Sequence, residues 1–153
     1  MDEKLRLAIP KRLREAMWDS RRGEEEAEDG RALLVFIAPG TDGSLEIYTE
    51  GTFQRLAARL AQASPTERHV RAFTRLFFAR AQQAELDRQG RVRISTELAE
   101  AAQLAKGTDV VLLGVQDHLE LWGQERWETY LAEKRSHYDD LAEAAFGSSG
   151  SPR

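Results

Sequence analysis

Residues 87–94 read DRQGRVRI, and residues 2–9 read DEKLRLAI. Both segments begin with an Asp-x-x-x-Arg motif and continue with alternating apolar residues, a pattern typical of a short half-buried strand. A helix-like stretch follows in each copy, with Leu13 and Leu98 at matching positions. The five-residue motif alone is weak, because the nine Asp and 18 Arg of the chain produce about one such motif by chance. The matched context is what indicates an internal repeat.

A second matched block lies further along each copy. LEIY at residues 45–48 corresponds to LELW at residues 119–122, and an aromatic residue, Phe53 or Trp127, stands five positions after each block. The copies are offset by 85 residues at the first block (2 to 87) and by 74 at the second (45 to 119), so copy one holds about eleven extra residues. We assign them to an acidic loop insertion near residues 19–31. The chain is therefore interpreted as a tandem duplication.

Each copy predicts the order turn, strand, short helix, strand, hairpin, strand, helix, which makes the fold class α+β. Halves of this size are marginal on their own, so we expect the two repeats to share one core, with a core built together with other subunits as the alternative. The expected domain boundaries are repeat one at 1–63, a bridging helix at 64–80, repeat two at 81–135, and a helix end with a flexible tail at 136–153.

The local signals predict individual elements. Strands are expected at 7–9, 31–38, 45–48, 91–94, 110–115 and 119–122, with a tight Asp-Gly hairpin turn between the second and third. Helices are expected at 11–17, around Phe53 to Leu60, from a Ser64 cap through Phe77, at 96–104 after a Ser95 cap, and at 124–146. Apolar residues of the bridging helix, together with Trp122 and Trp127, are interpreted as core rather than subunit contacts.

Several classes of function are excluded by composition. The chain has no cysteine, so thiol catalysis and zinc ribbons are excluded, and a reducing cytoplasm is the expected compartment. No segment predicts a membrane span or a signal peptide. The three histidines, His69, His118 and His137, show no metal-ligand spacing and are interpreted as surface residues. We expect no enzymatic activity, no cofactor, no metal and no small-molecule substrate.

The charge pattern is segmental. The net charge is −4, which argues against a general attraction to nucleic acid. Residues 1–22 nevertheless hold seven Lys or Arg against four acids, whereas residues 117–143 hold eight acids against three basic residues. A solvated surface is the ordinary explanation of any single cluster. Basic charge nevertheless accompanies both copies of the repeated motif.

These residues resemble the MraZ family. The resemblance rests on the Asp-x-x-Gly-Arg-apolar-x-Ile string, on VVLLGV at 110–115, on LELW at 119–122 with ERW close behind, and covers about residues 2–135. It implies a bacterial transcriptional regulator of the division and cell-wall gene cluster, built of two AbrB-like swapped-hairpin repeats. It also implies a ring-like homo-oligomer, associated with the nucleoid, that binds direct repeats in double-stranded promoter DNA through its Asp-x-x-x-Arg segments.

The resemblance carries the DNA-binding role to Asp2, Arg6, Asp87 and Arg91. Arginine suits this role because its planar fork can bond two acceptors on guanine or on a phosphate. Aspartate would repel phosphate, so we expect it to orient the guanidinium or to cap the turn. A purely structural turn bridge is the alternative, worth under about 1 kcal/mol. Candidate phosphate contacts, which position without specifying, are Lys4, Lys11, Arg12, Arg88 and Arg93.

The two copies are not expected to be equal. Copy two has a predicted strand, residues 78–86, before its motif, and in copy one either this strand has been lost or the true start lies upstream. Copy one also has Leu5 where copy two has Gly90. A left-handed backbone at Leu5 would cost about 1–2 kcal/mol. Ser95 also replaces the proline usual in the family. We therefore expect Arg91 to be the stronger site. The alternative function is an AbrB-like interaction module or antitoxin-type protein that does not read promoters.

Overall fold

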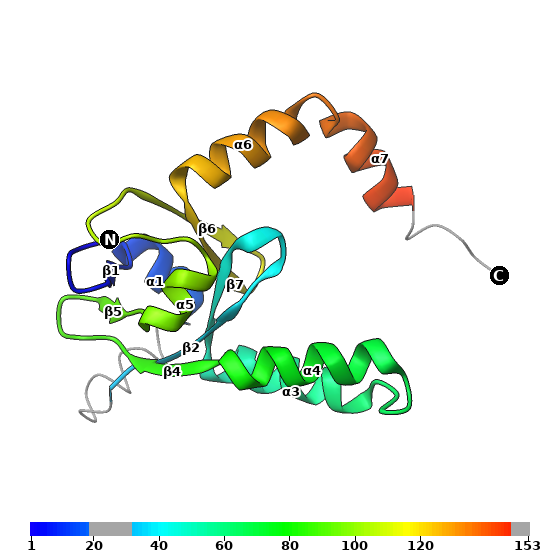
Figure 1. Ribbon diagram of the computed structural model, residues 1–153, viewed down its shortest axis with the longest axis horizontal. Helices are drawn as coiled ribbons and strands as arrows, with labels where there is room; N and C mark the ends of the chain where they lie inside the picture. The colour runs from blue at the N-terminus through cyan, green and yellow to red at the C-terminus, as the bar shows by residue number, and fades with distance from the viewer. Residues whose placement is uncertain (19–31, 148–153) are drawn as a thin grey trace. The chain divides into compact units, whose positions relative to one another are not determined.

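The two repeats interlock through two antiparallel strand pairs (Figure 1). The structure is a computed structural model and describes residues 1–18 and 32–147. Strand β1 (Arg6–Ala8) pairs with β5 (Arg91–Arg93), and β3 (Leu45–Thr49) pairs with β7 (His118–Gly123). Each pair joins a strand of repeat one to its counterpart in repeat two. This confirms the predicted α+β architecture of interleaved tandem repeats.

The larger sheet has five strands in the order β4-β2-β3-β7-β6. Its further members are β4 (Gln82–Glu85), β2 (Leu34–Pro39) and β6 (Val110–Val115). Strand β4 covers the outer edge of β2, whereas β6 forms an edge with no further strand among the described residues. The two halves of the sheet therefore differ by one strand.

A pseudo-two-fold axis relates the repeats. Leu7 lies opposite Val92 in the β1–β5 ladder, and these two residues are 85 apart, which is the repeat offset at that block. Glu46 lies opposite Glu120 in the β3–β7 ladder, and these are 74 apart, the offset at the second block. The axis therefore passes through both pairs.

Both repeats contribute to one hydrophobic core, as expected from their small size. Its buried residues come from β1, β5, α5, the inner face of the large sheet and the residues that flank these elements: Leu5, Leu7, Ile9, Val35, Ile37, Leu45, Ile47, Leu86, Val92, Ile94, Leu98, Ala99, Ala102, Leu104, Leu119 and Leu121. The alternation in β3 and β7 explains the selection, since Leu45, Ile47, Leu119 and Leu121 face this core while Glu46 and Glu120 face away. Burial of these side chains supplies most of the stability.

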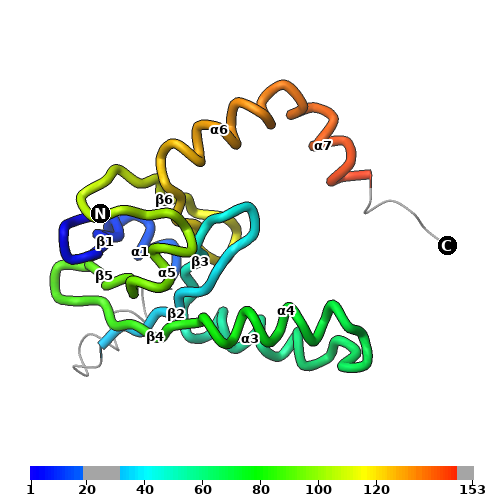
Figure 2. Tube along the Cα trace, in the orientation of Figure 1, coloured from blue at the N-terminus to red at the C-terminus, as the bar shows by residue number. Residues whose placement is uncertain are grey.

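The helices connect and cover these strands. In the part of the chain up to Gly123, they are α1 (Lys11–Met17), α3 (Glu50–Gln62), α4 (Arg68–Arg80) and α5 (Thr96–Ala101). The backbone trace shows α3 and α4 side by side (Figure 2), and stacking of Phe53 on Phe77 connects them at 6.0 Å between ring centroids. A second unit begins at Gln124 and contains α6 (Gln124–Arg135) and α7 (Tyr138–Gly147). No helix of the described residues is long and apolar enough to cross a membrane.

Several predicted boundaries were wrong. The Asp-Gly signal does not produce a two-residue turn, because Pro39 pairs with Leu45 and the connection between them includes a 3-10 turn, η1 (Thr41–Gly43). Ser64 does not cap α4, which begins only at Arg68 and has no side-chain cap. The strand predicted at residues 78–86, before Asp87, is shorter than expected, because α4 extends to Arg80 and β4 begins only at Gln82.

Two helix ends also differ from the prediction. Helix α5 ends at Ala101 rather than at residue 104, because Gln103 adopts the left-handed conformation at φ 55° and closes a Schellman motif. In that motif the N–H of Leu104 donates to the carbonyl of Ala99 at 2.8 Å. The long C-terminal helix is two helices, separated at Ser136 and His137. The predicted cap of α5 is confirmed, as Ser95 Oγ accepts from the N–H of Leu98.

The apolar residues of α4 are only partly core. Phe77 is buried in a second cluster with Ala38 and Tyr48, whereas Phe73 and Leu76 are 48% and 64% exposed. The interpretation of all apolar residues of this helix as core was therefore wrong. Trp122 is buried as expected, and Trp127 stacks on Tyr130 within the second unit. The acidic insertion near residues 19–31 lies outside the described residues.

Candidate nucleic-acid interface

The second Asp-x-x-x-Arg segment is a closed turn held by its aspartate. Oδ1 of Asp87 accepts hydrogen bonds from the backbone N–H groups of Gln89 and Arg91, both at 2.9 Å. Its Oδ2 accepts from Nε of Arg91 at 2.8 Å. The backbone closes the same turn, since the N–H of Gly90 donates to the carbonyl of Asp87. One carboxylate therefore both caps the turn and fixes the guanidinium.

The first segment repeats this geometry. Oδ1 of Asp2 accepts from the N–H groups of Lys4 and Arg6 at 2.9 and 2.8 Å, and Oδ2 accepts from Nε of Arg6 at 2.7 Å. The N–H of Leu5 donates to the carbonyl of Asp2, as that of Gly90 does to Asp87. In both copies the aspartate caps the turn through Oδ1 and orients the guanidinium through Oδ2, so both expected roles are observed.

The hydrogen bonds lower the pKa of both carboxyl groups. For Asp2 the strongest cause is the backbone N–H of Arg6, followed among the lowering causes by the Arg6 side chain and the N–H of Lys4. The same causes, from Arg91 and Gln89, lower the pKa of Asp87. Both aspartates are therefore ionised at neutral pH and hold the guanidinium groups by charge-assisted bonds.

The two turns are tied to each other. The N–H of Ile9 donates to the carbonyl of Gly90, and the N–H of Ile94 donates to the carbonyl of Leu5, at 3.0 and 2.9 Å. These bonds extend the β1–β5 ladder at both ends, so each turn is anchored on the strand of the other repeat. The two arginines are thus held on one rigid two-stranded ribbon.

Leu5 and Gly90 have the same left-handed backbone, at φ 58° and 73°. The strained conformation expected at Leu5 is therefore confirmed. Its side chain is 6% exposed and belongs to the main core. Burial of a leucine side chain contributes about 1.5–3 kcal/mol, which offsets the backbone cost. The first turn is consequently strained but intact.

The guanidinium groups remain available to a ligand. The side chains of Arg6 and Arg91 are 33% and 30% exposed, and each uses its Nε on the aspartate. Within residues 1–18 and 32–147 no partner is recorded for the Nη atoms of either arginine. Each arginine can therefore present two terminal donors while its orientation stays fixed.

The other candidate residues surround these turns unevenly. Lys4, Arg12, Arg88 and Arg93 are exposed, and Arg93 lies directly opposite Arg6 in the ladder. Lys11 is exposed as well, but its Nζ lies 3.5 Å from the carboxylate of Glu15 on the same helix. At equivalent positions, turn two carries Arg88 and Gln89 where turn one carries Glu3 and Lys4. The formal charge of these two positions is therefore +1 in turn two and 0 in turn one.

Arg14 is a cation near turn two that sequence reasoning missed. Its guanidinium covers Gly90, since a Cβ built on Gly90 would lie 2.6 Å from the Arg14 Cζ. The Nε of Arg14 is buried without a hydrogen-bond partner among the described residues. The signal available in the sequence was Gly90 itself, which leaves the space that this side chain fills.

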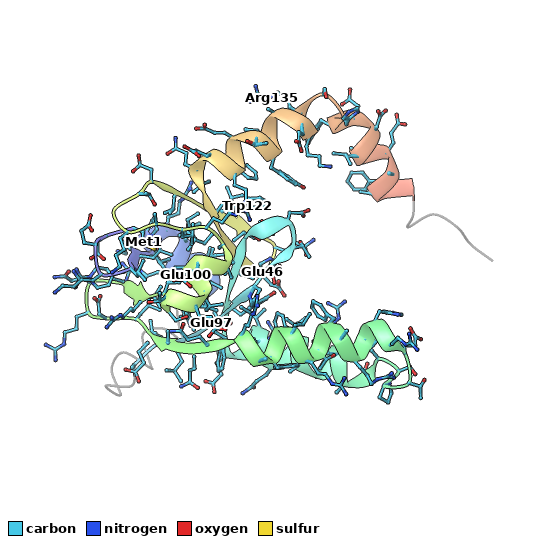
Figure 3. All side chains as sticks on the ribbon, viewed as in Figure 1. Met1, Glu46, Glu97, Glu100, Trp122 and Arg135 are labelled. Carbon is cyan, nitrogen blue, oxygen red and sulfur yellow. The ribbon has the colours of Figure 1, made fainter. Side chains whose placement is uncertain are left out.

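A second group of polar residues was also missed. Glu46, His118 and Glu120 gather on the face of the large sheet opposite the core. Figure 3 labels Glu46 and Trp122 among all the side chains. The side chain of His118 is only 15% exposed, so its interpretation as a surface histidine was wrong. The matching LEIY and LELW blocks placed the two glutamates at equivalent positions, which was the signal that could have found them.

Comparison with known proteins gives the family. A sequence model described as "MraZ protein, putative antitoxin-like" matches twice, at residues 1–76 and 77–148. Proteins named "Transcriptional regulator MraZ" are similar over 143 residues, which is 94% of this chain. Those of Lactobacillus helveticus, Lactobacillus gasseri and Lactiplantibacillus plantarum are 35%, 36% and 36% identical, with 89%, 89% and 90% of their own lengths covered. The chain belongs to the MraZ family.

Proposed function

We propose that this protein is a transcriptional regulator that reads double-stranded promoter DNA with its two Asp-anchored arginine turns. The observation that carries the proposal is the pair of equivalent turns, Asp2–Arg6 and Asp87–Arg91, on the β1–β5 ribbon. The name of its relatives supports the regulator role. The same family supports a promoter of the division and cell-wall gene cluster as the target, and a cytoplasmic, nucleoid-associated location.

The chemistry of the turns fits base or phosphate recognition. A guanidinium fixed through Nε keeps its Nη donors in a planar fork, which matches O6 and N7 of guanine or two phosphate oxygens. Fixing the side chain in advance reduces the conformational entropy lost on binding. The exposed cations Lys4, Arg88 and Arg93 then supply phosphate contacts that set the position on the duplex. The proposal needs no enzymatic step.

One chain offers only two such turns, so we assign the affinity to a homo-oligomer. Several copies that engage regularly spaced repeats gain effective concentration with no new kind of contact. Exposed apolar side chains on α4, namely Phe73, Leu76 and Phe78, support association with a second copy. A head-to-tail contact that closes on itself would produce the ring implied by the family.

The experiment is a titration of the full-length protein against labelled DNA from upstream of its own gene, at one fixed salt concentration. Scrambled DNA of the same length is the control for sequence, and Arg75→Ala, an exposed arginine on α4, is the control for charge. We expect preference for the promoter, retained in Arg75→Ala and lost when Arg6 and Arg91 are both changed to alanine. Equal binding to promoter and scrambled DNA would contradict the proposal and favour a non-reading interaction module.

A further inference from the structure

Two glutamates face each other at the junction of the repeats. Glu46 of β3 and Glu120 of β7 are direct partners in the antiparallel ladder. Like charges directly opposite each other destabilise a sheet. Both side chains are only partly exposed, so water screens the repulsion incompletely. The pair lies on the pseudo-two-fold axis, which brings the duplicated carboxylates together.

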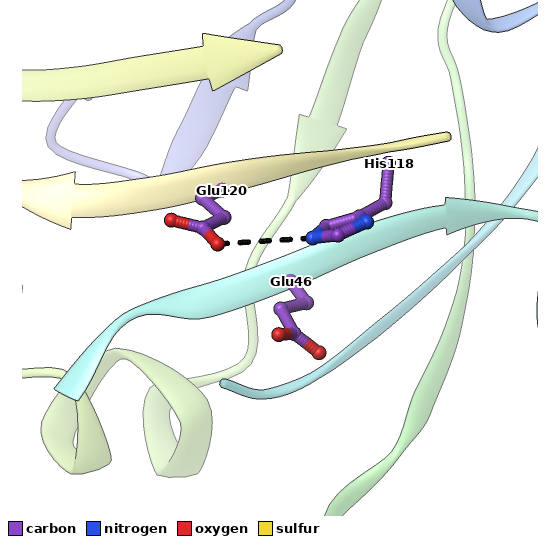
Figure 4. A group of neighbouring side chains, drawn as sticks. All are labelled: Glu46, His118 and Glu120. Carbon is purple, nitrogen blue, oxygen red and sulfur yellow. Dashed lines mark ion pairs between the residues drawn. The ribbon is translucent and has the colours of Figure 1, made fainter. Parts of the chain in front are cut away.

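His118 adds a nitrogen ligand to this pair (Figure 4). Its Nδ1 lies 3.1 Å from Oδ1 of Asp117, and because a carboxylate only accepts, Nδ1 is the donor in this contact. The other ring nitrogen, Nε2, is directed toward Glu120. Nε2 is buried, lies 3.7 Å from Oε1 of Glu120, and has no hydrogen-bond partner among the described residues. One imidazole nitrogen and two carboxylates thus lie close together.

Neighbouring side chains hold the two carboxylates in place. The hydroxyl of Tyr48 donates to Oε2 of Glu46, and the indole N–H of Trp122 donates to Oε2 of Glu120 at 2.9 Å. Such outer hydrogen bonds orient the ligands of protein metal sites.

We propose that Glu46, His118 and Glu120 bind a divalent transition-metal ion of the zinc class. One imidazole nitrogen and two carboxylate oxygens form a three-ligand set suited to zinc, with a fourth position for water. The Asp117–His118 contact supplies the carboxylate–histidine support typical of these sites. The bound ion would give Nε2 a ligand bond and would reduce the repulsion between the two facing glutamates.

The geometry is close to that of a bound site. The three ligand atoms lie within 4.8 Å of one another. Ligands about 2.0–2.1 Å from a tetrahedral metal are separated by about 3.3 Å, and the 3.7 Å between Nε2 and Oε1 of Glu120 nearly meets that value. Small rotations of the flexible glutamate side chains would complete the closure, with no movement of the backbone.

The site would connect the two repeats. Glu46 comes from repeat one, whereas His118 and Glu120 come from repeat two. The position in repeat one that corresponds to His118 is Ser44, whose hydroxyl donates to the carbonyl of Thr41 instead. The two repeats therefore supply a single histidine next to the pseudo-two-fold axis, and one metal ion is expected per chain. Since the metal binds only the folded chain, it should raise the thermal midpoint.

The test uses untagged full-length protein freed of metal by a chelator. Zn²⁺ is titrated by calorimetry, and Co²⁺ is used as a probe whose visible absorption reports tetrahedral coordination. His118→Gln and Glu120→Gln remove one ligand each. His137→Gln, which changes an exposed histidine just before α7 that is paired with Asp140, is the matched control. Thermal melts of every variant without metal establish that it folds.

We expect one Zn²⁺ per chain, a rise in the wild-type melting temperature, and at least a tenfold loss of affinity in His118→Gln and Glu120→Gln, with His137→Gln unchanged. Asp117→Asn should weaken binding by about tenfold, as loss of an outer-shell carboxylate does. Glu120→Gln should also melt higher than wild type without metal, because it removes the repulsion with Glu46. Equal zinc affinity in wild type and His118→Gln, or no binding to wild type at one equivalent, would overturn the site.

Discussion

The two Asp-x-x-x-Arg turns have the same hydrogen bonds but different sequences. Each aspartate accepts from two backbone N–H groups and from one arginine Nε, with distances that agree within 0.1 Å between copies. They differ at all three residues between the aspartate and the arginine, which are Glu3, Lys4 and Leu5 in turn one and Arg88, Gln89 and Gly90 in turn two. The aspartate and the opposite strand therefore define this turn, and glycine is only one way to accommodate its backbone.

The largest effect is expected when both arginines are removed. Each arginine fork on a base contributes about 1–3 kcal/mol, so Arg6→Ala with Arg91→Ala should weaken promoter binding by on the order of a hundredfold or more. Fluorescence anisotropy with promoter and scrambled DNA measures this loss. Retained preference for the promoter in the double variant would assign recognition to residues outside the turns.

A smaller effect, on the free energy of unfolding, is expected from replacing Leu5 in turn one by glycine. Leu5→Gly relieves about 1–2 kcal/mol of backbone strain but deletes a buried side chain worth about 2–5 kcal/mol. We therefore expect a net loss of about 1–3 kcal/mol in the free energy of unfolding, measured with urea.

Gln103→Gly is the matched control for that substitution. Gln103 also has a positive φ, 55°, but its side chain is exposed, so glycine should leave stability unchanged or raise it. If Leu5→Gly stabilises the protein as Gln103→Gly does, burial of the Leu5 side chain does not offset the cost of its left-handed backbone.

The charge difference between the turns should appear in the salt dependence of binding. Glu3→Arg gives turn one the cation that turn two has in Arg88, so one additional phosphate contact becomes possible. The slope of log K against log salt should steepen by about 0.9, with little change in sequence preference. Glu67→Arg, ahead of α4, is the control and should leave the slope unchanged. An equal change in both variants would show a general charge effect.

The smallest effect concerns acid stability. The pKa of Asp2 and of Asp87 is lowered from 3.8, so each carboxylate stabilises the fold fully above that value and loses its contribution as the pH falls through the lowered pKa. Asp2→Asn and Asp87→Asn should each flatten the fall of the urea midpoint below pH 3.8, to a similar extent. Asp109→Asn, a change of the same charge elsewhere, should not. A change in only one of the two variants would contradict the equivalence of the turns.

The sequence predicted the features that are repeated and local. Matched blocks located the duplication, the shared core and the anchored arginines, because each depends on residue types at fixed spacing. The left-handed backbone at Leu5 followed from its alignment with Gly90. The expectation that turn one is the weaker DNA site stays a prediction. The backbone strain behind it was visible in the sequence, whereas the compensating burial of Leu5 was not.

Features that depend on cross-repeat contacts could not be predicted from local patterns. The Arg14 side chain covers Gly90 across the two repeats, and Glu46 meets Glu120 only because β3 pairs with β7. The end of α5 at a left-handed glutamine and the break between α6 and α7 likewise leave no periodic signal. The exposure of Phe73 and Leu76 depends on which elements pack against α4. Helical periodicity alone does not specify those elements.

Both turns are intact and lie on one ribbon, so we expect both arginines to contact DNA. The test compares Arg6→Ala and Arg91→Ala side by side for affinity to the promoter at the same salt concentration. The matched geometry predicts that each substitution lowers the affinity at least fivefold, and that the two losses agree within about threefold. A loss in Arg91→Ala with wild-type affinity in Arg6→Ala would show that turn one has kept its structure without reading DNA.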